Sequence, residues 1–247
     1  MTERAQPEVV RFESPDELAV NVAHRFVELL ADAQADGRVP AVALTGGSIA
    51  VRIHEAVVSE ADRARVDWSR VDFWFGDERF VPVDSPDRNA GQATRAMLAH
   101  LPVDPDRVHV MPPAGGEFGD DADAAAAAYA DEVRRHGSGE FDLVMLGVGG
   151  NGHVASLMPG YPQLDVEDAI AVVVRESPKP PPTRMTLTFP ALEGTRQVWF
   201  VVAGQDKAEM VARALDPGTD FHDVPAARPK GRERTLWFLD EGAASKL

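Results

Sequence analysis

The sequence predicts an α/β protein with a Rossmann-like, mainly parallel sheet that carries helices on both faces. Short apolar runs alternate with amphipathic stretches of helical spacing along the whole chain. Glycine-rich turns directly follow two of the apolar runs, at Thr45–Ser48 and Gly147–Gly152, as strand-to-helix turns of open sheets do. No repeat or low-complexity linker divides residues 1–247, so we expect a single domain.

Composition excludes several classes of function. The chain has 247 residues, a net charge of −15 and no cysteine. Such a negative charge argues against a nucleic-acid or anionic-membrane partner, and without cysteine there is no disulfide framework, thiol nucleophile or thiolate metal site. No stretch reaches the about 18 apolar residues of a membrane span, and the N-terminus lacks an apolar signal core. We expect a cytoplasmic protein.

The chain begins with alternating strand and helix patterns. Val9–Phe12 is a short run typical of an edge strand. A helix is expected from Ser14, a good N-cap because proline and two acids follow it, to a stop at Gly37. Val39–Leu44 predicts the next strand, and a helical run follows from Ser48 to about residue 61.

The same alternation continues to the middle of the chain. Val71–Phe75 is an apolar strand, and a helix is expected from Asp87 to His100. Val108–Met111 predicts a strand. Asp120–Arg135 predicts an alanine-rich helix, since its acids lie at the start and its basic residues at the end. Two glycines close that helix, Gly137 and Gly139.

The second half contains further strands. The expected runs are Phe141–Leu146, Ala169–Val174, Arg184–Leu192 (broken at Pro190), Gln197–Val202 and Arg234–Leu239. Between them, Ser177–Pro182 is proline-dense and predicts a stiff extended segment, with a small subregion over the cleft after Ser177. A helix is expected from Gly204 to Leu215.

The most informative stretch is Phe141–Gly160, where a strand, a glycine turn, His153 and a short helix are expected in succession. Gly149, Gly150 and Gly152 suit a turn with positive φ or a backbone that closely approaches a ligand. At the carboxyl end of a strand, His153 is a candidate catalytic residue. The alternative is a structural histidine that caps the turn.

Gly147, Gly149 and Gly152 match the dinucleotide fingerprint G-x-G-x-x-G, with Glu176 at the place of a ribose-binding acid. That fingerprint requires a full helix after the third glycine. Pro159 restricts the helix to about two turns, and His153 would crowd a pyrophosphate. These features disfavour a nucleotide site.

A phosphate site is predicted where Gly46, Gly47 and Ser48 join a strand to a helix. Free backbone N–H groups and the positive end of the helix dipole converge there. The alternative is an ordinary turn. The turn is not a P-loop, because the lysine and the glycine spacing of that motif are missing.

Charged residues stand at two other strand ends. Asp77, Glu78 and Arg79 follow one strand and are costly to bury unless paired, so they belong to a cleft or to a solvated loop. Asn89 lies early in the next expected helix and can face the same sheet edge. Lys207 occupies a helix first turn, where a cation is unfavourable and an anionic ligand would relieve it.

Taken together, these stretches resemble the 6-phosphogluconolactonase family within the glucosamine-6-phosphate isomerase/deaminase superfamily. The matching motifs are LTGGS (Leu44–Ser48), FGDER-VP (Phe75–Pro82), LGVGGNGHVASLMPG (Leu146–Gly160), PPPTRMTLT (Pro180–Thr188) and VAGQDKA (Val202–Ala208). The resemblance implies a Rossmann-like fold, no cofactor and hydrolysis of 6-phosphoglucono-δ-lactone to 6-phosphogluconate in the oxidative pentose phosphate pathway.

The sequence departs from the family pattern at a few positions. Asn151 replaces an aspartate that would orient the histidine, so a role for a carboxylate at this position is in doubt. Ser85 stands in place of a second histidine, and Met158 in place of a common phenylalanine.

The resemblance and the residues together suggest roles. The substrate phosphate is expected on the N–H groups of Gly46, Gly47 and Ser48, with charge from Lys207, Arg184 and Arg79. His153 is expected to take a proton from water, and the backbone of Gly149–Gly152 or an arginine to stabilise the oxyanion. Asp77 or Glu78 would hold the imidazole or the water, or pair with Arg79. No metal is expected, and the protein is expected to be a monomer or homodimer with a sugar-phosphate lactone as ligand.

Three rival functions stay open. A sugar-phosphate isomerase or deaminase would share the fold and phosphate site. A non-catalytic sugar-phosphate sensor would bind without turnover. A dinucleotide-dependent oxidoreductase would use the glycine fingerprint.

Overall fold

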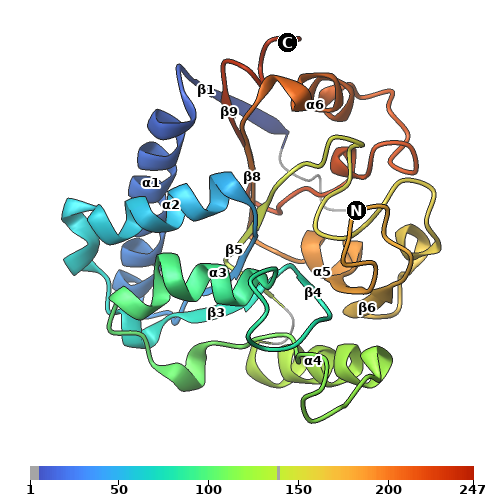
Figure 1. Cartoon of the computed structure of the whole chain (residues 1–247). Helices are drawn as coiled ribbons and strands as arrows, with labels where there is room; N and C mark the ends of the chain where they lie inside the picture. Colours follow the sequence, from blue (N-terminus) through green and yellow to red (C-terminus); the bar gives the residue numbers. More distant parts are fainter. Residues whose placement is uncertain (1–5, 138–139) are drawn as a thin grey trace.

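The computed structural model describes residues 6–137 and 140–247 and contains a central six-stranded sheet whose neighbouring strands are all parallel (Figure 1). In spatial order the strands are β1 (Pro7–Phe12), β9 (Arg234–Asp240), β8 (Gln197–Val202), β5 (Leu143–Leu146), β2 (Ala41–Leu44) and β3 (Asp72–Phe75). The predicted Rossmann-like fold class is confirmed. The strand order reverses between β2 and β5, and ligands of open α/β sheets bind at such a point.

A second, antiparallel sheet lies beside the first. It contains β4 (Asp77–Arg79), β7 (Arg184–Leu187) and β6 (Ala171–Val174), with β7 in the middle. Two of these strands were expected from the sequence, whereas β4 was taken as a charged strand end. Only β7 comes from the region after Ser177, where a small subregion was expected; β6 precedes Ser177, and β4 comes from much earlier in the chain.

Helices cover both faces of the parallel sheet (Figure 1). The α-helices are α1 (Pro15–Ala35), α2 (Ser48–Ser59), α3 (Asn89–Ala96), α4 (Ala122–Gly137), α5 (Phe189–Glu193) and α6 (Ala208–Leu215). As predicted, Ser14 caps α1, because its side chain accepts the Glu17 N–H at 3.2 Å. No helix in the described part of the chain has the length and apolar character needed to cross a membrane.

Alternation along the strands sorts the core into two layers. In β5, Leu143 and Met145 pack with α1, α2 and α3 residues, whereas Val144 and Leu146 pack with α4, α6 and the small sheet. Successive strand side chains point to opposite faces, so a fully apolar run is what a strand covered on both sides requires.

Three local predictions are wrong. Val108–Met111 forms only an isolated bridge from Val108 to Phe73, since the two following prolines have no N–H to continue a ladder. The helix expected from Asp87 begins at Asn89, and its last turn is the separate 3₁₀ segment Leu98–His100.

The third error lies directly after His153, where a turn replaces the expected short helix. The Leu157 N–H donates to the Val154 carbonyl at 2.8 Å, and Ala155 has a φ of 48°, which no α-helix contains. The expected helix stop at Gly139 lies outside the described residues.

Candidate active site

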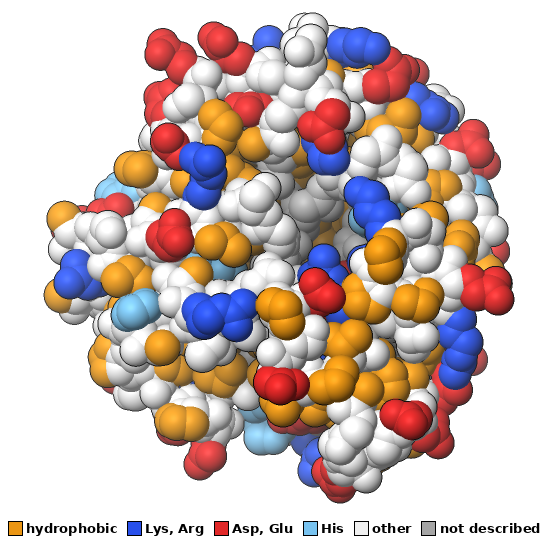
Figure 2. Space-filling model, in the orientation of Figure 1, with side chains coloured by type: hydrophobic (Ala, Val, Ile, Leu, Met, Phe, Trp, Pro, Cys, Tyr) orange, Lys and Arg blue, Asp and Glu red, His pale blue; other side chains and the backbone are white. Residues whose placement is uncertain are grey.

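A cleft of about 260 Å³ opens at the point where the strand order reverses, beyond the carboxyl ends of β2 and β5. Figure 2 shows a hollow near the centre of the molecule, with Lys and Arg side chains around it. The cleft is lined by Thr45, Gly46, Gly47, Asp77, Arg79, Asn89, Gly147, Val148, Gly149, His153, Ala155, Lys179, Pro180, Arg184 and Lys207. The structure therefore brings together nine of the predicted site residues, from six separate stretches of the chain.

The imidazole of His153 is held by its own turn. Its Nδ1 lies 2.5 Å from Oδ1 of Asn151, and a carbonyl oxygen accepts but does not donate. Nδ1 therefore carries the hydrogen, and Nε2 keeps its lone pair as a proton acceptor. The amide of Asn151, which stands where the family pattern has an aspartate, thus contacts the imidazole directly.

Gly149 makes room for this imidazole. A β-carbon at Gly149 would lie 2.0 Å from both Cε1 and Nδ1 of His153, closer than any real contact. The turn is closed by the Gly149 N–H, which donates to the His153 carbonyl at 2.9 Å, and by the Gly152 N–H, which donates to the Gly149 carbonyl at 2.9 Å. Because these two N–H groups are used inside the turn, the predicted oxyanion role does not fit them.

The electrostatic setting of His153 favours the neutral ring. Burial lowers its pKa from 6.5 to about 4, the nearby charge of Asp77 opposes that shift, and Lys179, Arg184 and Lys207 add to it. The imidazole is therefore uncharged at neutral pH and ready to accept a proton.

We expect the ring resonances of His153 to titrate with a midpoint near pH 4 in the free protein, because the cleft disfavours the imidazolium. NMR of histidine Cε1–H groups measures this midpoint. His54, buried in α2, also has a pKa near 4, so the His153 signal is assigned by its loss in His153→Ala. A midpoint for His153 at pH 6 or above would contradict this electrostatic account.

Asp77 lies at the floor of the cleft in a fixed hydrogen-bond network. Its Oδ1 accepts the Asn89 Nδ2–H at 3.0 Å, and its Oδ2 accepts the hydroxyl of Ser156 at 2.6 Å. Ser156 is fully buried and its hydrogen is given to Asp77, so it is not placed as a nucleophile. Asn89 also accepts a hydrogen bond from Arg79 and fills the space beside Gly46, where a β-carbon would lie 1.9 Å from its Oδ1.

Glu78, the neighbouring candidate, does not face the cleft. Its fully buried carboxylate accepts the N–H groups of Asn89 at 2.7 Å and Ala90 at 2.9 Å, at the start of α3, and pairs with Arg88 at 3.7 Å. Burial raises its pKa, and these partners oppose that rise. The structure assigns Glu78 to the helix terminus, which leaves Asp77 as the carboxylate of the cleft.

Four cationic side chains line the cleft, and two of them lie directly opposite each other. Arg79 on β4 pairs with Arg184 on β7 in the antiparallel register, so both side chains are on one face. Burial and the charge of Arg79 lower the pKa of Arg184. Lys207 pairs with Asp206 at 2.7 Å, and Lys179 comes from the proline-rich segment. Like charges held opposite each other create a site for an anion.

The N-terminus of α2 faces the same cleft. Gly47, with a φ of 98°, is the N-cap, and no side chain caps this end of the helix. The first N–H groups of α2 are therefore left to a ligand or to solvent.

Besides Glu78, three predicted residues do not line the cleft: Ser48, Gly150 and Gly152. The side chain of Ser48 is exposed, and Gly152 packs against Val224. Sequence reasoning missed Thr45, Gly147, Val148, Ala155, Lys179 and Pro180. Of these, Lys179 gave a signal, as the one cation inside the SPKPPP segment.

Comparison with known proteins agrees with this geometry. A family model described as glucosamine-6-phosphate isomerases/6-phosphogluconolactonase matches residues 13–237. A 6-phosphogluconolactonase of Streptomyces coelicolor is 43% identical over 98% of this chain and 95% of its own length. One of Mycobacterium tuberculosis is 40% identical, with 96% of each chain covered.

A solved structure of a 6-phosphogluconolactonase from Trypanosoma brucei superimposes with a TM-score of 0.86 and 25% identity, over 98% of this chain and 99% of that one. The extent of the model match and the similarity to full-length relatives lead to one conclusion: this chain belongs to the glucosamine-6-phosphate isomerase/6-phosphogluconolactonase family.

Proposed function

We propose that this protein is a 6-phosphogluconolactonase, which hydrolyses 6-phospho-D-glucono-1,5-lactone to 6-phosphogluconate. The observation that carries the proposal is one imidazole with a free acceptor nitrogen in a cleft of four cations. An anionic group binds the cations, and a reactive carbonyl lies within reach of a general base. The names of the relatives support the choice of substrate.

The phosphate end of the substrate is proposed to bind at the start of α2. There the N–H groups of Gly46, Gly47 and Ser48 face an anion together with Arg79 and Arg184. Asn89 supports this placement, because it contacts Gly46 and accepts a hydrogen bond from Arg79. Lys179 and Lys207 add positive charge to the same cleft.

The lactone end is proposed to lie against His153. Nε2 accepts a proton from water as the water oxygen bonds to C1, and the carbonyl becomes an oxyanion stabilised by a cationic side chain. The C1 to ring-oxygen bond then breaks, and the imidazolium returns the proton to the leaving oxygen. Asp77 stabilises the transient imidazolium by its charge. General-base catalysis typically raises the rate of such a step by about 10²–10⁴-fold.

Asn151→Ala is expected to lower kcat by about fivefold, because one hydrogen bond worth about 1 kcal/mol holds the reactive tautomer. The reason is that an unheld imidazole populates the tautomer whose Nε2 carries the hydrogen. Steady-state kinetics of lactone hydrolysis measure kcat. Asn151→Asp restores an acceptor at the same place and is expected to recover activity. Equal kcat in wild type and Asn151→Ala would contradict this role.

The function itself is tested by following 6-phosphogluconate through a coupled dehydrogenase, with the lactone generated in situ. Acceleration over the spontaneous background supports the proposal. Turnover of glucosamine 6-phosphate without lactone hydrolysis would indicate the isomerase or deaminase branch of the family. Binding of 6-phosphogluconate with no turnover would indicate a sensor.

A further inference from the structure

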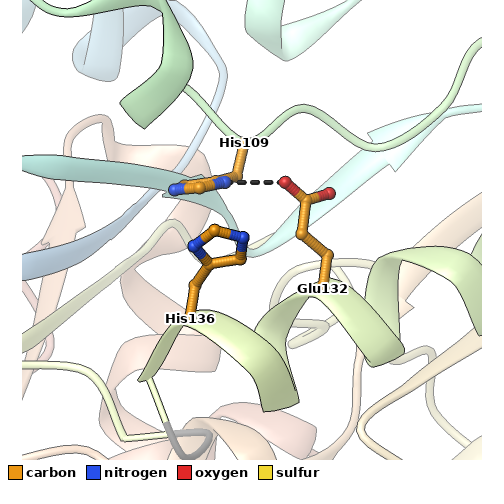
Figure 3. Close-up of side chains that lie close together, drawn as sticks. All are labelled: His109, Glu132 and His136. Carbon is orange, nitrogen blue, oxygen red and sulfur yellow. Dashed lines mark hydrogen bonds and ion pairs between the residues drawn. The ribbon is translucent and has the colours of Figure 1, made fainter.

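A second group of chemically reactive side chains lies away from the cleft, between α4 and the segment at Val108 and His109 that lies beside β3. Figure 3 shows His109, Glu132 and His136 turned toward one another. One potential ligand atom from each lies within 4.8 Å of the others. We propose that these three residues bind a divalent transition-metal ion of the Zn²⁺ type and clamp α4 to the sheet.

The donor set selects the class of metal. Two imidazoles and one carboxylate suit Zn²⁺ and its neighbours in the transition series, whereas Ca²⁺ and Mg²⁺ prefer oxygen ligands alone. Ligand atoms of a tetrahedral zinc ion lie about 3.3 Å apart, given zinc–ligand distances of about 2.0–2.1 Å. The three candidate ligand atoms lie within 4.8 Å of one another, and the exposed side chain of His136 can turn to adjust this spacing.

His109 has carboxylates against both of its nitrogens. Its Nδ1 lies 2.7 Å from Oε1 of Glu132, and its Nε2 lies 3.4 Å from Oδ1 of Asp72. Both contacts are hydrogen bonds only when the ring is protonated; in the neutral ring one nitrogen turns a lone pair toward a carboxylate oxygen, and a metal ion between them removes that repulsion. When Nε2–H donates to Asp72, Nδ1 and Glu132 together face a metal, and Asp72 takes the place that supporting carboxylates occupy behind zinc-bound histidines.

Packing holds His109 in position for this role. The ring stacks on Trp74 with a centroid distance of 3.8 Å and an interplanar angle of 13°. Its backbone N–H donates to the Phe73 carbonyl at 2.8 Å. The buried ligand is thus preorganised, and no hydrogen bond or ion pair holds the described side chain of His136 elsewhere.

The two remaining ligands come from one face of α4. Glu132 and His136 are four residues apart, so they lie on adjacent turns. One turn earlier, the hydroxyl of Tyr129 donates to the Phe75 carbonyl at 3.0 Å and accepts the Phe75 N–H at 2.9 Å. A metal at His109 would add a second connection between α4 and the strand that leads to Asp77.

The test is zinc titration of EDTA-treated protein by calorimetry. We expect one zinc ion per chain at this site and at least a tenfold loss of affinity in both His136→Ala and Glu132→Gln. These variants alter exposed or half-exposed side chains, so folding is retained and is checked by circular dichroism. Retained lactone hydrolysis in both variants separates this site from the cleft.

A matched control is His222→Ala, since His222 is an exposed histidine with two carboxylates at 2.8 Å. Its zinc affinity is expected to equal that of the wild type. If a second zinc ion binds in the cleft, the same titration of His153→Ala is expected to lose that ion and to keep the one at His109, Glu132 and His136. The proposal is overturned if the protein binds no zinc, or if His136→Ala and Glu132→Gln bind it with wild-type affinity and stoichiometry.

An independent readout comes from Trp74. Because its ring stacks on His109, Cu²⁺ at this site is expected to quench part of the tryptophan fluorescence, and the quenching is expected to disappear in His136→Ala. Identical quenching curves for wild type and His136→Ala would count against the site.

Discussion

His153→Ala is expected to lower kcat for lactone hydrolysis by about two to four decades, because it removes the proposed general base. This corresponds to about 3–5 kcal/mol of activation free energy. The residue contributes little else, since its ring nitrogen bonds only to Asn151 in the described structure. The coupled assay, corrected for spontaneous hydrolysis, measures the loss.

Binding of the product provides the control for this variant. The four cations of the cleft are unchanged in His153→Ala, so its dissociation constant for 6-phosphogluconate is expected to stay within a few-fold of wild type. Wild-type activity in the variant would agree with the proposed function but would contradict the proposed role of His153 as general base. A collapse of product binding together with kcat would indicate a structural role for the imidazole.

Gly149→Ala is expected to reduce kcat nearly as far as loss of the histidine does. The added methyl group would occupy the position of the imidazole, 2.0 Å from two ring atoms, so the ring must leave its hydrogen bond to Asn151. Gly149 does not have a positive φ, and alanine therefore fits the backbone. Kinetics together with thermal unfolding distinguish displacement of the ring from loss of the fold.

Gly150→Ala is the matched comparison. A β-carbon at this adjacent glycine meets nothing nearer than Nζ of Lys207 at 3.7 Å, an ordinary contact. We therefore expect a far smaller change in kcat than for Gly149→Ala. A similar loss of kcat in Gly149→Ala and Gly150→Ala would contradict this account. It would mean that Gly149 is needed for flexibility of the turn and not for the space that the imidazole occupies.

Local patterns were enough to predict most of the sheet. The run Leu143–Leu146 is apolar on both faces of the strand, and Ser14 followed by Pro15 is a strong local signal for a helix start. The position of the cleft also follows from local patterns. Glycine turns at the carboxyl ends of β2 and β5 place their residues at one edge of the sheet, because the two strands are parallel neighbours.

The failures concern features that depend on distant partners. Asp77 and Glu78 are equivalent acids in the sequence, and only the position of α3 directs Glu78 to a helix terminus. The turn after His153 needs Ala155 at a positive φ, against its own preference, so no local rule predicts it. Lys179 reaches the cleft from the proline-rich segment. That segment has neither helical nor strand periodicity, so its sequence does not indicate which way the lysine side chain points.

The opposed pair Arg79 and Arg184 has a consequence for how the reaction ends. Hydrolysis converts an uncharged ring ester into a carboxylate, so the product leaves with one more negative charge than the substrate had on arrival. A cleft built from four cations attracts that product at least as strongly as the substrate. Because the same positive charge attracts the lactone and the acid, we expect accumulated product to compete with the lactone for Arg79 and Arg184.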